Sequence, residues 1–189
     1  MTSCSPEQMR DALGIGKERD ILDYVHSLPS TQEEEAQEKL RVIERRAMVD
    51  MVPQPGLNEL MGYLKSKDIP KSICTRNFPI PVQHLLDNFL REHHIDPLVT
   101  REFKPPKPAP DGILHIAREW NIDPNNIVMV GDSVDDMRAG HAAGTTTILL
   151  QSDVNRHLNE MVETDAVVHR LDDIIELFEK GFNRKERVN

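Results

Sequence analysis

Two carboxylates four residues apart, Asp132 and Asp136, have the types and spacing that most clearly suggest chemistry in this sequence. They follow an apolar run at residues 127–130, whose branched side chains are typical of a strand buried on both faces of a sheet. Gly131 ends the run, which predicts Asp132 at the strand's carboxyl end and Asp136 one turn into the next helix. Two converging carboxylates repel each other unless a hard cation lies between them. The spacing therefore predicts a Mg²⁺ site formed by Asp132 and Asp136.

A simpler interpretation is that Asp132 and Asp135 only cap the helix, because aspartate is a favoured N-cap residue. The pattern Gly-Asp-Ser-x-Asp-Asp follows four apolar residues and precedes Ala-Gly-His-Ala-Ala-Gly, a context that favours the metal site. Asp135 is the carboxylate that we assign to a capping or supporting role.

Other polar side chains follow the other predicted strands. A short strand at residues 71–75 ends in Thr75, and the proline-rich segment around Lys107 follows a weak strand at residues 99–103. In a parallel sheet the carboxyl ends of the strands share one edge, where ligands bind. A threonine hydroxyl can donate to a phosphate oxygen, and a lysine held between prolines can neutralise developing charge. The set predicts a phosphoryl site of Thr75, Lys107 and the metal, with Arg76 and Asn77 as weaker candidates for substrate contact.

The elements that must position these residues change character near Pro53. Residues 6–51 read as three helices without strand character, whereas residues 53–182 alternate helices with short strands. Alternation of this kind predicts an α/β fold with a parallel sheet. We therefore expect a helical unit at residues 1–52, a core domain at residues 53–182 and a frayed tail at residues 183–189.

The composition limits the classes of partner. The 189 residues carry a formal net charge of −9, which argues against a nucleic-acid or anionic membrane surface. The sequence has no apolar run of 18 residues, and two cysteines are too few for a disulfide framework. A small phosphorylated metabolite in the cytoplasm is the expected partner and compartment, and the sequence leaves the oligomeric state open.

In this order along the chain, three segments resemble motifs of the haloacid dehalogenase superfamily, near its phosphoglycolate-phosphatase-like branch. They are Ile-Cys-Thr75-Arg-Asn, Lys107-Pro-Ala-Pro and Val-Gly-Asp132-Ser-Val-Asp-Asp136-Met. The resemblance covers residues 53–180 and implies a Rossmann-like core that hydrolyses phosphate esters with Mg²⁺ through an aspartyl-phosphate. It implies that Thr75 binds the phosphoryl group, that Lys107 steadies nucleophile and phosphate, and that Asp132 and Asp136 hold Mg²⁺. Residues 1–52 would be a helical cap.

The first motif of that superfamily, a strand ending in Asp-x-Asp-Gly-Thr, is not found in these 189 residues. Asp23 lies in a helical pattern and Asp50 lies at the end of a long helix, so neither replaces it. In the family this strand lies between the strands that end here at Thr75 and Asp132, so those two are expected to lie a gap apart. We expect a chain shortened at its N-terminus that has weak phosphatase activity or none.

Two other interpretations remain open. The chain could be a pseudoenzyme that keeps the fold as a binding or regulatory protein. It could also resemble a response-regulator receiver, which pairs acids with a threonine and a lysine. A receiver needs an acid pair near its N-terminus and an aspartate nucleophile before Thr75, and the helical first 50 residues do not supply them.

Overall fold

The computed structural model describes residues 6–49 and 51–181, which form two compact units. One contains the N-terminal helices up to Pro53 together with residues 83–89, and the other contains residues 54–82 and 90–181. The division passes through a single helix, so residues 83–89 group with the helical unit rather than with the rest of the expected core domain. The predicted tail lies outside the described residues, as does Asp50.

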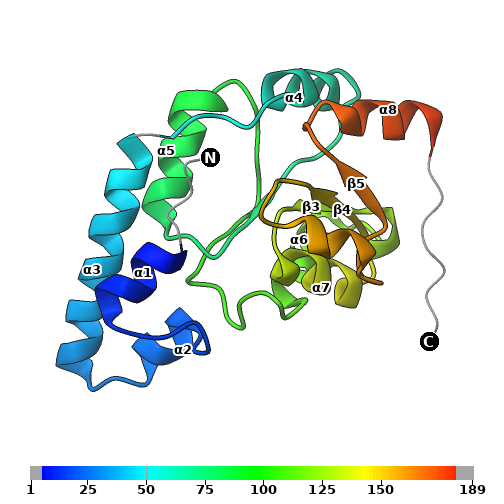
Figure 1. Ribbon diagram of the computed structural model, residues 1–189. Coiled ribbons are helices and arrows are strands. Elements are labelled where there is room, and N and C mark those ends of the chain that lie inside the picture. Colours follow the sequence, from blue (N-terminus) through cyan, green and yellow to red (C-terminus); the bar gives the residue numbers. More distant parts are fainter. Residues whose placement is uncertain (1–5, 50, 182–189) are drawn as a thin grey trace. The chain divides into compact units, whose positions relative to one another are not determined.

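The helical unit is built on one long helix. Helix α3 (Ser30–Val49) packs against α1 (Pro6–Leu13) and α2 (Ile21–His26), as Figure 1 shows for the blue part of the chain. The Asp20 side chain caps α2 by accepting hydrogen bonds from the amides of Leu22 and Asp23. Asp23 is therefore a helical residue, which confirms that it does not end a strand.

The second unit alternates strands and helices, as the sequence predicts. Its elements are α4 (Leu57–Ser66), β1 (Ile73–Cys74), the first residues of α5 (Pro79–Phe89), β2 (Leu98–Val99), α6 (Asp111–Trp120), η1 (Pro124–Asn126), β3 (Val128–Gly131), α7 (Val134–Ala143), β4 (Thr146–Leu150), η2 (Arg156–Glu160), β5 (Ala166–Val168) and α8 (Asp173–Lys180). None of the helices in the described part of the chain is long and apolar enough to cross a membrane.

All the strand pairs are parallel, but they form two sheets. Strands β1 and β2 pair with each other, while β3, β4 and β5 form a three-stranded sheet with β4 in the middle. In the described residues the strand that ends before Thr75 therefore does not pair with the strand that ends before Asp132. This topology agrees with the expectation that the two strands are not direct neighbours, and the absent strand between them remains a prediction.

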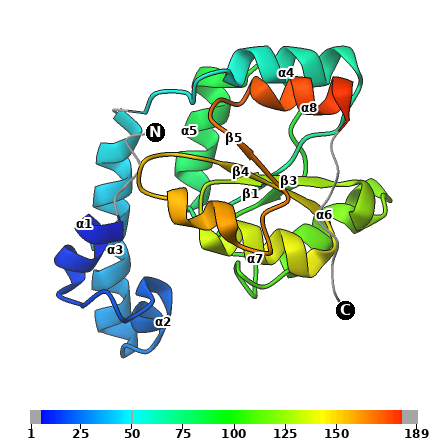
Figure 2. The same ribbon diagram turned by 45° about the vertical axis from the view of Figure 1, so that its right-hand side comes forward.

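Helices cover both faces of the three-stranded sheet (Figure 2). On one face, Ile148 and Val168 pack with Leu60 of α4 and Ile174 of α8. On the other face, Leu149 packs with Met137 of α7. Helices α6 and α7 also share a cluster of Ile113, Ala139 and Ala143, to which Cys74 of β1 and Met129 of β3 contribute. This cluster connects the two sheets beneath the edge where the strands end.

Two sequence-based expectations were wrong in detail. All four residues of β3 are only half-buried rather than buried on both faces, because β3 is an edge strand of its sheet. The strand expected at residues 99–103 is instead Leu98–Val99. The chain turns away after Val99, where the Arg101 amide donates to the Asn77 carbonyl rather than to a strand.

The close packing of α7 on the sheet depends on Gly140. A Cβ at this position would lie 2.7 Å from Thr147 Cγ2 and 2.9 Å from Met129 Cβ. We expect Gly140→Ala to lower the free energy of unfolding by roughly 1–3 kcal/mol through overpacking. The matched control is Gly62→Ala in α4, where a Cβ would have no neighbour within 4 Å.

Gly62→Ala should instead raise the free energy of unfolding by roughly 0.5–1 kcal/mol, because alanine loses less backbone entropy in a helix. Denaturant titrations followed by circular dichroism measure both changes. Changes of the same sign in the two variants would contradict the packing of α7 described above.

Candidate functional site

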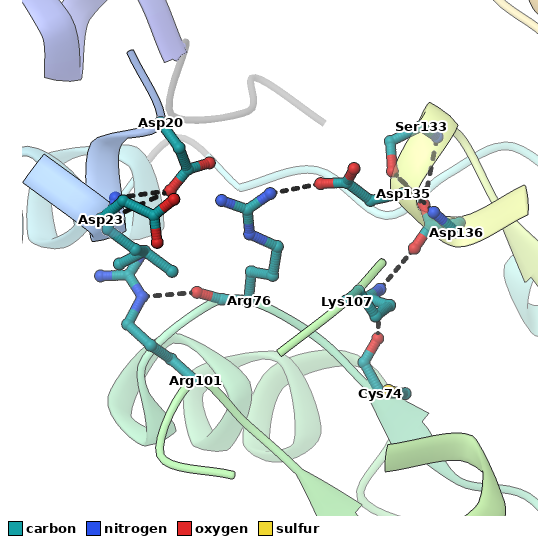
Figure 3. Close-up of polar contacts among 10 residues, drawn as sticks. Asp20, Asp23, Cys74, Arg76, Arg101, Lys107, Ser133, Asp135 and Asp136 are labelled. Carbon is teal, nitrogen blue, oxygen red and sulfur yellow. Dashed lines mark hydrogen bonds and ion pairs between the residues drawn. The ribbon is translucent and has the colours of Figure 1, made fainter. Parts of the chain in front are cut away.

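A buried lysine connects the two sheets at the edge where their strands end. Lys107 Nζ donates a hydrogen bond of 2.7 Å to the Cys74 carbonyl of β1, and it also pairs with Asp136 Oδ1 on α7 (Figure 3). The Lys107 and Asp136 side chains are 10% and 9% exposed, so the ion pair is largely shielded from water. This contact is consistent with the sequence-based prediction that Lys107 and Asp136 lie at the same edge of the sheet.

The other oxygen of Asp136 is fully used by the start of α7. Asp136 Oδ2 accepts hydrogen bonds from the Asp132 amide at 3.2 Å, the Ser133 amide at 3.1 Å and Ser133 Oγ at 2.7 Å. Ser133 is the N-cap of α7, and with Asp136 it forms a capping box. Gly131 allows this close approach, because a Cβ there would lie 2.3 Å from Asp136 Cβ. Neither Asp132 nor Asp135 is therefore the cap that the simpler interpretation proposed.

Asp132 has a different environment from Asp136. Its carboxylate is outside any ion pair among the described residues, and the residue is exposed as a whole. Desolvation by the surrounding protein raises the pKa of Asp132, and the nearby charge of Asp136 raises it further, while Lys107 lowers it. Ionisation of Asp132 therefore costs the folded state free energy, and its carboxylate is available to a ligand.

The segment after β1 presents Thr75 on a rigid turn. The Thr75 amide donates to the Val99 carbonyl at 2.8 Å, and Thr75 Oγ1 accepts from the Asn77 amide at 3.1 Å. That contact uses the hydroxyl oxygen as an acceptor, so its proton is free to be donated to an anion. Arg101 supports the turn from behind, because its Nε donates to the Arg76 carbonyl at 2.6 Å.

Arg76 and Asp135 form a second ion pair at this edge (Figure 3). The two side chains are 31% and 23% exposed, so water screens this pair more than the Lys107–Asp136 pair. The contact gives Asp135 a supporting role. It also places the guanidinium of Arg76 beside the turn that carries Thr75. Substrate contact by Arg76 and Asn77 remains a prediction.

The described residues do not by themselves fit a Mg²⁺ ion. Magnesium requires six oxygen ligands in a nearly octahedral arrangement. Both oxygens of Asp136 already accept hydrogen bonds from the protein, which leaves the carboxylate of Asp132. In residues 6–49 and 51–181 no group of three histidine, cysteine or acidic side chains is placed to hold a metal. A Mg²⁺ site of Asp132 and Asp136 therefore remains a prediction.

Sequence reasoning missed three side chains that build this edge. Ser133 was visible as the first member of a Ser-x-x-Asp capping box. Arg101 and Asn155 act across long sequence separations, and no local pattern identifies them.

Cys74 is close to Lys107, but burial raises the pKa of its thiol, which disfavours the reactive thiolate.

The buried pair predicts a large effect of Asp136 on stability. We expect Asp136→Asn to lower the free energy of unfolding by roughly 3–5 kcal/mol, because it leaves the Lys107 ammonium buried beside a neutral amide. The control is Asp135→Asn on the same helical turn, whose more exposed pair with Arg76 should cost about 1 kcal/mol or less. Equal losses in a denaturant titration would show that the Lys107–Asp136 pair contributes no special stability.

Because the pKa of Asp132 is raised, neutralising this residue should increase the free energy of unfolding at neutral pH, whereas neutralising Asp136 should decrease it. The folded state binds the Asp132 proton more tightly than the unfolded chain does, because the unfolded pKa is near 3.8 and the folded pKa is higher. The free energy of unfolding therefore falls as the pH rises from about 3.8 through the folded pKa of Asp132. Asp132→Asn should therefore be more stable than the natural chain at pH 7 and equally stable well below pH 3.8. Asp153→Asn, at an exposed position, is the control. A stability difference between Asp132→Asn and the natural chain that does not change with pH would refute the raised pKa of Asp132.

Comparisons with known proteins identify the family of this chain. A model of the family described as haloacid dehalogenase-like hydrolase matches residues 5–144. An uncharacterized hydrolase of Saccharomyces cerevisiae is 44% identical over 191 residues, which cover 94% of this chain and 87% of the yeast protein. A phosphoglycolate phosphatase of Nitrosospira multiformis is 29% identical over 150 residues, and the match covers 75% of this chain and 63% of that protein.

The fold also matches solved structures. A family IA, variant 3 hydrolase from Entamoeba histolytica superposes with a TM-score of 0.73 at 19% identity, covering 90% of this chain and 85% of that one. This likeness confirms the predicted Rossmann-like α/β fold. Together with the family match and the yeast relative, it shows that the chain belongs to the haloacid dehalogenase-like hydrolases.

Proposed function

We propose that this protein derives from a Mg²⁺-dependent phosphatase of small phosphate esters, and that the 189-residue chain itself hydrolyses them weakly or not at all. The observation that carries the proposal is the contact of Lys107 with both the residue before Thr75 and the carboxylate of Asp136. This contact gathers a hydroxyl, an ammonium group and carboxylates at one sheet edge, where α/β proteins bind ligands.

The chain's own residues suit the recognition of a phosphoryl group. Thr75 would donate its hydroxyl proton to a phosphate oxygen, since Asn77 already uses the hydroxyl as an acceptor. Lys107 would supply positive charge from a position that its two partners hold firmly. Backbone hydrogen bonds to Val99 and Arg101 keep the Thr75–Asn77 turn from moving as the anion binds.

Magnesium dependence is part of the proposal, with Asp132 and Asp136 as the residues nearest to the cation. When bound, Mg²⁺ would neutralise charge on the phosphate. The proposal includes a cytoplasmic location, because two cysteines in 189 residues suit a reducing compartment. It includes no nucleic-acid or membrane partner, given the net charge of −9.

The expectation of weak activity has a physical basis in the carboxylates of this edge. Asp135 is paired with Arg76 and Asp136 with Lys107, so both are engaged as supports. Asp132 is outside these pairs, but partial desolvation and the nearby charge of Asp136 raise the pKa of its carboxyl. We therefore assign none of the three as the nucleophile of an aspartyl-phosphate mechanism.

The test measures hydrolysis of an aryl phosphate and of 2-phosphoglycolate, with Mg²⁺ and with EDTA. The ester is chosen because one relative is named a phosphoglycolate phosphatase. We expect a folded 189-residue chain, judged by circular dichroism, to release little or no phosphate. A version extended by a strand ending in Asp-x-Asp-Gly-Thr should be active with Mg²⁺, and its Asp132→Asn variant should lose about 100-fold or more.

The matched control is an extension ending in Asn-x-Asn-Gly-Thr, which supplies a strand of the same length without the two carboxylates. Activity of the unextended chain that disappears in Asp132→Asn would show that its own residues supply a nucleophile, and would refute the expectation of weak activity. A folded extended chain that is inert towards a panel of phosphate esters would refute the phosphatase proposal.

A non-catalytic binding or regulatory protein is the second candidate. The contact that favours it is the Lys107–Asp136 pair, in which the cation expected to serve the phosphate is neutralised by the carboxylate expected to serve the metal. An inert extended chain that still binds inorganic phosphate, measured by calorimetry, would support this candidate.

A further inference from the structure

Asn155 is a buried amide whose position does not match the ordinary role of asparagine before a helix. It is the residue before η2 and is 5% exposed. Asparagine at this position usually caps the helix with its side chain, but here the side chain makes no capping hydrogen bond. A buried amide needs partners, because an unpaired one is costly. Its partners lie elsewhere, at the ends of the strands.

The amide of Asn155 joins the ends of β3 and β4. Nδ2 donates to the Asp132 carbonyl at 2.8 Å and to the Leu150 carbonyl at 3.0 Å, while Oδ1 accepts from the Ser152 amide at 2.7 Å. The pairing of β3 with β4 ends at Gly131 and Leu149. The side chain therefore bridges the next residue of each strand, beyond the point where the backbone ladder stops.

This contact completes the fixation of the backbone around Asp132. The peptide group between Asp132 and Ser133 is held on both sides, its carbonyl by Asn155 and its N–H by Asp136 Oδ2 at 3.1 Å. The preceding N–H, that of Asp132 itself, also donates to Asp136 Oδ2. With both peptides held, Asn155 on one side and Asp136 on the other set the direction in which the Cα–Cβ bond of Asp132 leaves the backbone.

We infer that Asn155 is a positioning residue that holds the Asp132 carboxylate in place at the candidate site. The purpose of that placement rests on the proposed function, but the placement itself can be tested without any activity. Asn155 acts through the backbone of Asp132 and contacts neither of the residues that would bind the phosphoryl group. Lys107 and Thr75, in contrast, would touch the phosphoryl group directly under the proposed function.

The experiment compares amide hydrogen exchange, read by NMR, in the 189-residue chain and three variants. Asn155→Asp keeps the acceptor for Ser152 and replaces the donor with an oxygen, whereas Asn155→Ala removes both. In both variants the amides of Asp132 and Ser133 should exchange roughly tenfold faster or more. The Ser152 amide should lose protection in Asn155→Ala only.

The matched control is Asn159→Asp, which makes the same charge change nearby in an amide that donates to Gln151 rather than to a strand end. It should leave the amides of Asp132 and Ser133 unchanged, and all variants should keep the protection of the β4 amides. Unchanged exchange at Asp132 and Ser133 in the Asn155 variants would overturn the inference. Equal acceleration throughout β4 would do so as well, because it would mark a general folding role.

A measurement on the unaltered chain covers the case in which both variants fail to fold. The two Nδ2 protons of Asn155 should exchange much more slowly than the side-chain amide protons of an exposed asparagine such as Asn58, because both Asn155 protons are donated to carbonyls. Rapid exchange of these protons would overturn the inference. Failure of the phosphatase assays, in contrast, would leave each of these exchange measurements unaffected.

Discussion

The arrangement of this edge of the molecule depends on the two contacts that the Lys107 ammonium group makes. The strands β1 and β3 belong to different sheets, so no backbone ladder joins them in the described residues. Lys107 spans the interval by binding the Cys74 carbonyl and the Asp136 carboxylate, above the apolar cluster that α6 and α7 share. A buried ion pair compensates its loss of hydration only when its other hydrogen-bonding groups are satisfied. Here Lys107 Nζ also donates to the Cys74 carbonyl, and Asp136 Oδ2 accepts three further hydrogen bonds from the start of α7.

This arrangement sets two uses of the same groups against each other. The charge of Asp136 is balanced by Lys107, and its oxygens hold the turn that follows β3. A cation that approached Asp136 would compete with Lys107 for Oδ1, and a phosphate that approached Lys107 would compete with Asp136. The two ligands would therefore favour each other's binding, because together they separate the pair and replace both of its charges. Under the proposed function, a site of this kind would favour the joint binding of cation and anion over the binding of either alone.

Much of this edge follows from local sequence, and the remainder depends on distant contacts. The strand, the break at Gly131 and the helix that carries Asp136 were predictable, because apolar runs, glycine and capping residues act over a few positions. The half-burial of β3 was not, because it depends on which strands pair, and pairing is decided far along the chain. Asn155 was hidden for the same reason. It lies 23 residues from Asp132 and in a loop whose local pattern indicates only a helix cap.

The two carboxylates of the proposed metal site, Asp132 and Asp136, lie in different environments. Asp136 has gained every available partner, as a residue does when it stabilises a fold. Asp132 has its backbone fixed by Asn155 and Asp136, yet its own carboxylate has a raised pKa beside a second acid. A structure that only needed a turn here would be more stable with a neutral side chain. Under the proposed function, a cation bound beside Asp132 would offset the unfavourable ionisation of this carboxylate.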